Sequence, residues 1–258
     1  AQIAAEELGI PLEHVSVSLG DSARGPFASI SAGSSTIPSM GPAVRAAAAD
    51  ARRQIEEIAE QMDKAGAPVA EVVSVLESAQ ILGSGARGPN PAGRQVLTFG
   101  VQVAEVAVDV ETGEVWVERI AAVHDVGRVI NPLGASSQVE GGIIQGVGHT
   151  LSEERIVDPA TGSILTRTLD AYKMPTIADV PEIVTELIDV PDPHLTNLGA
   201  KGLGEPPIIP TAAAIANAIR DATGADVRSL PISRDEMLRA LREAAEREKE
   251  RRGAPAAV

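Results

Sequence analysis

Residues 96–123 read VLTFGVQVAEVAVDVETGEVWVERIAAV, and this stretch decides the fold class. Two runs rich in β-branched residues flank the short segment Glu111-Thr112-Gly113-Glu114. A Gly-containing loop of this length between two such runs is typical of a β-hairpin. We therefore expect two antiparallel strands joined by a tight turn.

Around this hairpin, the hydrophobic pattern indicates a mixture of strands and helices. The expected strands are residues 12–20, 69–76 and 182–190, with a second, smaller hairpin at 155–166. The expected helices are residues 42–64, opened by Pro42, then 136–151 and 207–223, and a last helix from about Ser233, where Ser233 and Glu236 form a capping box. Because the elements do not follow a βαβ rhythm, the pattern predicts an α+β fold.

A loop rich in Gly and Pro at residues 83–94 suggests where the chain divides. We expect a first subdomain over residues 1–95 and a second over residues 96–242. Residues 243–258 carry mixed charges and are expected to be a solvated helix or a flexible tail.

The composition excludes several classes of function. The chain of 258 residues has a net charge of −14, whereas nucleic-acid binding needs clustered Lys and Arg. It contains no cysteine, so it offers no disulfide, thiolate zinc site or cysteine-ligated iron–sulfur cluster. No apolar run approaches the roughly 20 residues that cross a bilayer. Because Ala1 opens what reads as the middle of a helix, without a signal peptide, we expect a processed or truncated chain.

Two loops near the N-terminus are candidates for ligand binding. Gly83-Ser84-Gly85-Ala86-Arg87-Gly88 matches GxGxxG, but Pro89-Asn90-Pro91 blocks the helix that a nucleotide site needs, so we predict a plain loop. In Ser31-Ala32-Gly33-Ser34-Ser35-Thr36, backbone N–H groups and hydroxyls could hold a phosphate or a pterin edge, helped by the following helix N-terminus. From the residues alone, an ordinary loop that caps this helix is the favoured alternative.

A helix with four glycines is the next unusual feature. Gly141-Gly142-Ile143-Ile144-Gln145-Gly146-Val147-Gly148 lies in an otherwise helical stretch, where each Gly costs about 1 kcal/mol relative to Ala. Something must approach this backbone closely, either another helix or a flat ligand. The amide of Gln145 could contact an oxo group or a pterin edge, and helix packing is an equally good explanation.

Lys201-Gly202-Leu203-Gly204-Glu205-Pro206-Pro207 is the sharpest chemical signal. Pro206 is expected to hold Glu205 in an extended conformation at the start of a helix. The helix dipole would favour the ionised carboxylate there, and burial would raise its pKa toward that of a working base. A helix cap with a salt bridge to Lys201 is the alternative. His124-Asp125, at a strand end, is more often a structural pair than a ligand.

Four segments occur in one order: HDVGRVINP (124–132), QVEGGIIQGVGHTLSEE (138–154), YKMPTIADVPEI (172–183) and GAKGLGEPPIIPTAAAIANAI (199–219). Together they resemble the C-terminal half of the molybdopterin-binding subunit of xanthine dehydrogenases and aldehyde oxidoreductases. The resemblance covers about residues 1–240. It implies that residues 1–95 and 96–242 are two mixed α/β subdomains of the second molybdopterin-binding domain.

The resemblance implies a molybdenum hydroxylase that oxidises an aldehyde or an N-heterocycle with water-derived oxygen. Glu205, the Glu of the family's K-G-x-G-E motif, would be the catalytic base. The implied cofactor contacts are Ala32, Gly33, Ser34, Ser35, Gln145 and Gly204. Molybdenum would be held through the pterin dithiolene, in the cytosine dinucleotide form, and not by side chains.

The resemblance also implies partners, because the family's first molybdopterin domain is missing from this chain. We expect that domain or subunit, an iron–sulfur subunit with [2Fe-2S] clusters and an FAD subunit, in a cytoplasmic complex or in one exported to the periplasm with a partner. A non-catalytic half that binds the pterin or serves assembly is the alternative function.

Overall fold

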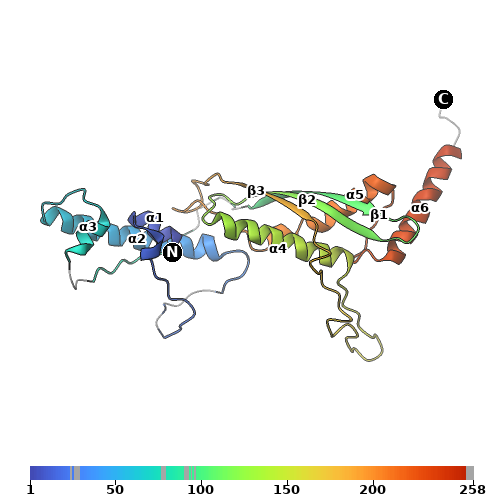
Figure 1. Cartoon of the computed structure of the whole chain (residues 1–258), viewed down its shortest axis with the longest axis horizontal. Coiled ribbons are helices and arrows are strands. Elements are labelled where there is room, and N and C mark those ends of the chain that lie inside the picture. The colour runs from blue at the N-terminus through green and yellow to red at the C-terminus, as the bar shows by residue number, and fades with distance from the viewer. Residues whose placement is uncertain are drawn as a thin grey trace. The chain divides into compact units, whose positions relative to one another are not determined.

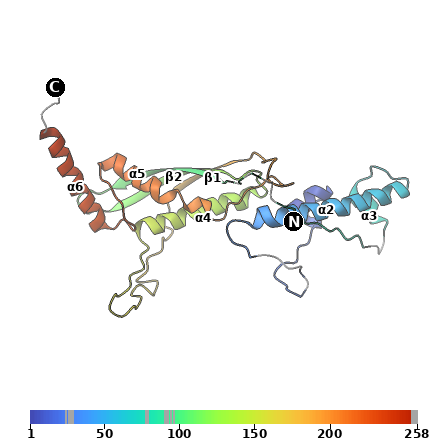
Figure 2. The same cartoon turned by 180° about the vertical axis from the view of Figure 1, so that it is seen from behind.

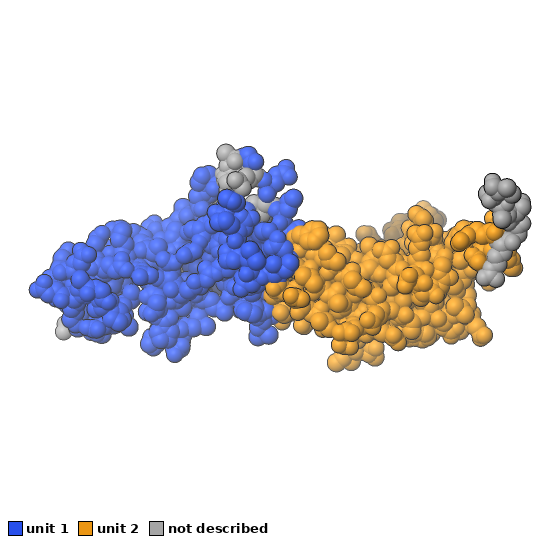
Figure 3. Space-filling model, turned by 90° about the horizontal axis from the view of Figure 1, so that it is seen from above, with its two compact units in different colours: residues 1–98, 125–135, 188–204 blue, residues 99–124, 136–187, 205–258 orange. Residues whose placement is uncertain are grey.

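The computed structural model describes residues 1–23, 25, 30–76, 80–89, 93, 95 and 97–253. The chain forms two compact units, coloured separately in Figure 3. Unit 1 contains residues 1–98, 125–135 and 188–204, and unit 2 contains residues 99–124, 136–187 and 205–258. The two units are described separately below.

This division differs from a linear split at residue 95. Residues 125–135 and 188–204 leave the second half of the sequence and pack with the N-terminal third of the chain. The two segments bond to each other, with Arg128 N–H donating to the Gly199 carbonyl at 2.9 Å, and to the N-terminal part, with Asn197 Nδ2 donating to the Pro42 carbonyl at 3.2 Å. The boundaries predicted for the subdomains and for the tail stay predictions.

Unit 1 is built on a long helix. Helix α1 (Gln2–Leu8) lies along helix α2 (Thr36–Gln61), as Figure 1 shows, and the short helix α3 (Val69–Ser74) packs against the far end of α2. A small hydrophobic core joins α2 and α3 through Ile55, Ala59 and Val72. Burial of this apolar surface is what holds the two helices together.

Two strands that the sequence predicts in unit 1 are wrong. Residues 12–20 form a single 3-10 turn, η1 (Leu12–His14), followed by irregular chain in which Leu19 is 87% exposed. In residues 69–76, Val69–Ser74 form α3 and Val72 packs into the core with α2. Alternating β-branched residues do not make a strand where no neighbouring strand in the described chain pairs with them.

Helix α2 begins six residues earlier than expected, so Pro42 lies inside it. Proline has no N–H, and the Pro38 carbonyl therefore lacks its usual helical donor. The Arg87 side chain supplies one, with Nε donating to the Pro38 carbonyl at 2.9 Å. A loop residue thus replaces the missing backbone hydrogen bond.

Unit 2 contains a three-stranded sheet with the order β1-β2-β3. Strands β1 (Phe99–Val108) and β2 (Val115–Asp125) form the predicted hairpin, and β3 (Glu182–Ile188) confirms the predicted strand. Asp109 stabilises the hairpin turn, because its carboxylate accepts the N–H groups of Glu111 and Thr112. The second predicted hairpin is reduced to one bridge between Val157 and Ile164 around a tight turn.

The predicted helices of the second half are confirmed, with shifted ends. They are α4 (Pro132–Leu151), α5 (Thr211–Thr223) and α6 (Arg234–Gly253). The first residues of the helix expected over 207–223 belong instead to a separate 3-10 turn, η2 (Pro206–Ile208). Helix α4 starts early because the Asn131 side chain accepts the Gly134 N–H at 2.8 Å and Pro132 suits the first helical position. Half of the capping box forms, with Glu236 N–H donating to Ser233 Oγ. No helix in these described ranges is both long and apolar enough to span a membrane.

The sheet of unit 2 has one covered and one bare face. Helix α5 packs on β1, and Figure 2 shows it running beside the strand. On β1 the inward positions include Gln102, which is buried, whereas the outward side chains of Phe99, Val101 and Val103 are 65%, 47% and 63% exposed. These three side chains form an exposed apolar patch on the outer face of β1, and the same face of the sheet also carries Glu105, Glu118 and Glu186.

Candidate functional site

The serine loop of unit 1 has an unusual backbone. Gly33 and Ser34 both adopt left-handed conformations, with φ of 61° and 56°. The Ser35 hydroxyl donates to the Ala32 carbonyl at 2.6 Å, and the hydroxyls of Ser31 and Thr36 bond to each other. Ser35 lies at the N-cap position of α2, but its side chain makes no cap hydrogen bond.

The early start of α2 places the serine loop at the N-terminus of this helix. Thr36 is the first helical residue, so the serine loop leads directly into the N-terminus of a 26-residue helix. Ala32 and Gly33 are exposed, and Ser34 and Ser35 are half-buried. Hydroxyls and backbone N–H groups at a helix N-terminus favour negatively charged groups.

Unit 1 brings the serine loop against the Lys-Gly-Leu-Gly segment. A Cβ on Gly202 would lie 2.3 Å from the Ser34 carbonyl oxygen, and one on Gly204 would lie 3.1 Å from Ser34 Oγ. The Gly202 carbonyl in turn accepts the Thr98 hydroxyl at 2.8 Å. Two segments about 170 residues apart in sequence are therefore in direct contact, and only glycine fits at Gly202.

Lys201 anchors this segment to the end of β2. Its ammonium lies 2.5 Å from the Asp125 carboxylate, and both side chains are largely shielded from solvent. Burial raises the pKa of the Asp125 carboxyl, but Lys201 and the Gly127 N–H together more than offset this, and its pKa is lowered. The sequence suggested a salt bridge between Lys201 and Glu205, but Lys201 pairs with Asp125 instead.

Glu205 lies in unit 2, at the start of η2. Its φ of −90° and ψ of −29° are helical, so the predicted extended conformation is wrong. The preference imposed by Pro206 is overridden because Glu205 O accepts the Ile208 N–H at 3.2 Å and closes the 3-10 turn. The Glu205 side chain is exposed, so the burial expected around the carboxylate is not seen within unit 2 as the structure describes it.

The glycines of α4 pack against the turn that follows Glu205. A Cβ on Gly142 would lie 2.6 Å from Pro207 Cβ, and one on Gly146 would lie 2.5 Å from Thr211 Cβ. Close packing, one of the two explanations left open by the sequence, therefore accounts for these two glycines. Gln145 lies on the exposed face of α4.

A buried polar network holds the same turn from the side of the sheet. Gln102 Nε2 donates to the Pro207 carbonyl at 2.6 Å, and the Thr211 hydroxyl donates to Gln102 Oε1 at 2.7 Å. The sequence reasoning missed both residues. A polar side chain at an inward position of β1, between two apolar neighbours, was the available signal.

His124 and Asp125 do not form the structural pair that the sequence suggested. Asp125 bonds to Lys201, whereas His124 points into unit 2 and is fully buried. Within the described residues, neither ring nitrogen of His124 has a hydrogen-bond partner, and burial lowers the pKa of its imidazole. Gly100 makes room for the ring, since a Cβ there would lie 2.3 Å from Nδ1.

Packing against α2 explains the first two glycines of the GxGxxG loop. A Cβ on Gly83 would lie 2.1 Å from the Ala47 carbonyl oxygen, and one on Gly85 would lie 2.2 Å from Ala47 N. Both glycines let the chain run against α2. Residues 80–89 form no helix, and the predicted blocking residues Asn90 and Pro91 lie outside the described residues.

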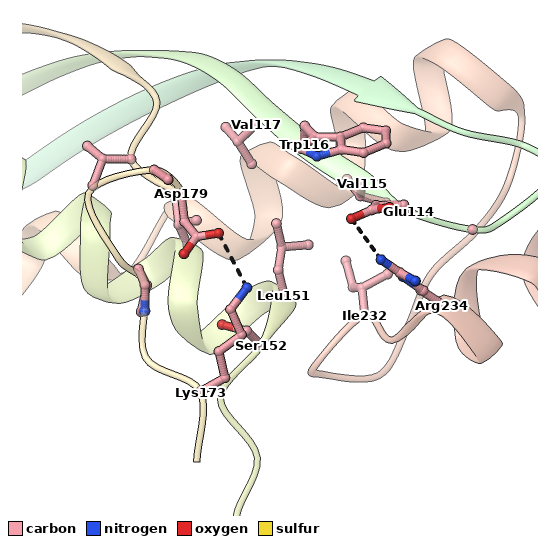
Figure 4. A pocket seen from close by; sticks show the side chains of 15 residues that line it. Glu114, Val115, Trp116, Val117, Leu151, Ser152, Lys173, Asp179, Ile232 and Arg234 are labelled. Atoms are coloured by element: carbon pink, nitrogen blue, oxygen red, sulfur yellow. Dashed lines mark hydrogen bonds and ion pairs between the residues drawn. The ribbon is translucent and has the colours of Figure 1, made fainter. Parts of the chain in front are cut away.

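Unit 2 also has a surface pocket of about 460 Å³. Figure 4 shows it between the hairpin turn and the end of α4, with ion pairs Lys173–Asp179 and Arg234–Glu114 in its wall. Trp116 lines it as well. None of the residues predicted for cofactor binding or catalysis lines this pocket.

Comparison with known proteins identifies the family. The family model for the molybdopterin cofactor-binding domain matches residues 1–181. The aldehyde oxidoreductase molybdenum-binding subunit of Escherichia coli is 35% identical over 250 residues, which cover 92% of this chain and 34% of that protein. The nicotine 6-hydroxylase large subunit of Paenarthrobacter nicotinovorans is 30% identical, with 94% and 33% covered.

Solved structures of similar proteins support the same family assignment. Quinoline 2-oxidoreductase from Pseudomonas putida superposes with a TM-score of 0.81 at 27% identity, over 93% of this chain and 34% of that one. Aldehyde oxidoreductase from Desulfovibrio gigas superposes with a TM-score of 0.74 at 28% identity, over 93% and 27%. This chain thus spans about a third of the length of these relatives. The resemblance seen in the ordered motifs is confirmed: the chain belongs to the molybdopterin cofactor-binding family of xanthine dehydrogenase and aldehyde oxidoreductase molybdenum-binding subunits.

Proposed function

We propose that this chain is the catalytic C-terminal part of a molybdenum hydroxylase subunit, which oxidises an aldehyde or an N-heterocycle with water-derived oxygen. One observation carries the proposal. The serine loop and the Lys201–Gly204 segment, which sequence reasoning assigned separately to one cofactor site, are packed together in unit 1. Glu205, the proposed base, is the next residue in the chain.

The residues of this contact suit a molybdopterin cofactor. They offer hydroxyls and backbone N–H groups at the start of α2, which can bind phosphate and the polar edge of a pterin. We propose that Ala32, Gly33, Ser34, Ser35 and Gly204 contact the cofactor in its cytosine dinucleotide form, with a further contact from Gln145. When bound, the molybdenum cofactor supplies the two-electron acceptor for the oxidation.

Glu205 then acts as the general base. Its carboxylate accepts the proton of the water-derived oxygen nucleophile that attacks the substrate carbon. The Glu205 side chain makes no cap hydrogen bond to η2, where Pro206 and Pro207 have no N–H to donate. Its exposure in this chain leaves it accessible to a substrate and to a covering partner.

We further propose that the chain works with partners: the other molybdopterin domain or subunit, a [2Fe-2S] subunit and an FAD subunit. The exposed apolar patch on β1, formed by Phe99, Val101 and Val103, is a suitable surface for such a contact, because exposed apolar patches mark interfaces. The cytoplasm is the proposed compartment.

The test is Glu205→Gln in the whole enzyme that carries this chain, purified with its partners. Turnover of a panel containing an aldehyde, nicotine and quinoline should fall by about 10²- to 10⁴-fold for whichever compound is a substrate. Molybdenum and released cytosine nucleotide should stay at wild-type levels. Glu246→Gln, an exposed glutamate on α6, is the matched control and should leave turnover unchanged.

Two results would count against the proposal. A Glu205→Gln enzyme that retains wild-type turnover would show that Glu205 is not the base. A verified intact complex without molybdenum or pterin, isolated from molybdenum-replete cells, would indicate a non-catalytic relative.

A further inference from the structure

The turn that carries Glu205 is clamped from two sides inside unit 2. Pro207, two residues after Glu205, is buried, and its carbonyl accepts Gln102 Nε2 from strand β1 at 2.6 Å. On the other side, Gly142 and Gly146 of α4 leave no room for a side chain against Pro207 and Thr211. The turn therefore has little freedom to shift relative to either element.

The polar groups of this clamp hydrogen-bond to one another and are shielded from solvent. Gln102 is 8% exposed and Thr211 is fully buried. Thr211 Oγ1 donates to Gln102 Oε1 at 2.7 Å and lies 3.4 Å from the Pro207 carbonyl. The partners fix the orientation of the Gln102 amide, because the reversed amide would place its oxygen against the Pro207 carbonyl.

The Pro207 carbonyl is a backbone acceptor that no side-chain substitution removes, so an apolar residue in place of Gln102 would leave it without this donor. Thr211 does not pair the carbonyl in this network, because its hydroxyl donates to Gln102 Oε1. Together the hydrogen bonds give the turn a direction, since they set where the Pro207 carbonyl, and with it the preceding residues, must lie.

We propose that Gln102 and Thr211 are positioning residues that hold the Glu205 carboxylate in its working place through the Pro207 carbonyl. This inference rests on the proposed function of Glu205. Neither residue touches the reacting atoms, so the expected consequence of losing either is misplacement of the base. A displacement of about 1 Å far from the chemistry can reduce turnover about 100-fold.

The experiment compares three threonine variants in the whole enzyme. Thr211→Val removes the hydroxyl and keeps the shape, and Thr211→Ser keeps the hydroxyl. Thr223→Val is the matched control: Thr223 lies in the same helix, and its hydroxyl likewise bonds to a carbonyl four residues earlier, Ile219, at 2.7 Å. Gln102→Leu is a second probe of the same network from β1.

We expect Thr211→Val to lower kcat by about 10- to 100-fold with KM within about twofold of wild type, and to shift the pH profile of kcat. Thr211→Ser should restore most of the loss, and Thr223→Val should match wild type. A merely structural role for Thr211 would lower stability without changing the pH profile or splitting kcat from KM.

Hydrogen exchange provides a readout that does not depend on turnover. Pro206, Pro207 and Pro210 have no amide proton, so a peptide covering residues 205–210 reports mainly on Ile208 and Ile209, which donate to Glu205 and Pro206. Exchange there should be faster in Thr211→Val and in Gln102→Leu than in Thr211→Ser and Thr223→Val.

Wild-type kcat and exchange in Thr211→Val would overturn the inference, as would equal losses in Thr211→Ser and Thr211→Val. The Glu205→Gln enzyme separates this failure from failure of the proposed function. If Glu205→Gln abolishes turnover and Thr211→Val does not affect it, the base stands and only its positioning by Gln102 and Thr211 is wrong. If Glu205→Gln is fully active, the proposed function itself fails.

Discussion

The serine loop and helix α4 are both rich in glycine, but for different physical reasons. Gly33 has a left-handed backbone, and no other part of the described chain lies within 4 Å of where its Cβ would be. Gly146 is helical, and a Cβ would lie 2.5 Å from Thr211. The first glycine is required by backbone conformation and the second by space.

The two units use glycine for different structural purposes. In unit 1, glycine lets an exposed loop present its N–H groups and hydroxyls beside the Gly202 backbone. In unit 2, glycine lets a helix approach a buried turn, so that the turn cannot move. A glycine-rich sequence therefore signals close approach or unusual φ, and only the neighbouring atoms show which.

Gly146→Ala should give the largest loss of stability in this comparison. The new Cβ would have to displace the buried Thr211 side chain, and overpacking of this kind costs about 1–3 kcal/mol. Urea unfolding of the full chain measures the loss. A variant as stable as wild type would show that the approach of α4 to the turn is looser than the structure indicates.

Gly33→Ala should cost about 1–2 kcal/mol, because an L-residue in the left-handed region is strained whatever space surrounds it. Gly33→Asn is the control, since Asn tolerates this region better than Ala, and it should recover part of the loss. The same unfolding measurement applies. Equal losses in the two variants would indicate that crowding, and not φ, makes glycine necessary.

His124 should make stability fall as the pH drops below about 6.5, the ordinary pKa of an unfolded histidine. Burial holds the pKa of its imidazole below the unfolded value of about 6.5, so the folded state binds fewer protons in this range. Stability is therefore fully present above about pH 6.5 and is lost as the pH falls toward the folded pKa, by at most about 1.4 kcal/mol per pH unit.

The measurement is the free energy of unfolding across this pH range for the wild type and for His124→Gln. The variant should show a flatter dependence, because glutamine does not titrate. An unchanged slope would assign the pH dependence to other groups. Carboxylates with lowered pKa values, such as Asp125, act below this range and should not contribute.

Gly141→Ala should have the smallest effect and the opposite sign. Gly141 is helical and exposed, and none of the described residues lies within 4 Å of its missing Cβ. Alanine there should stabilise the chain by about 0.5–1 kcal/mol, because it restores helix propensity without a clash. Destabilisation in the full complex, but not in the separate chain, would place a partner or ligand against this face of α4.

Sequence reasoning worked best where one signal was local. The 111–114 turn predicted the β1–β2 hairpin, and the helix expected over 207–223 ends where predicted, because Gly224 closes it with a left-handed φ of 73°. It failed at residues 12–20 and 69–76, because a strand depends on a partner that the pattern does not contain. It also missed the early start of α2, since Arg87 compensates for Pro42 from 45 residues away.

The sequence by itself determined the family, through four ordered motifs, and it singled out Glu205, the serine loop and the glycine helix. Only the tertiary structure decided that Ser34 meets Gly202, that Lys201 binds Asp125 and not Glu205, and that Gln102 and Thr211 hold the turn at Pro207. The physical reason is sequence distance. Motifs and turns are set by neighbouring residues, whereas these contacts join residues from 76 to 168 positions apart. Closing such long loops costs chain entropy, and the contacts that offset this cost form only in the folded chain.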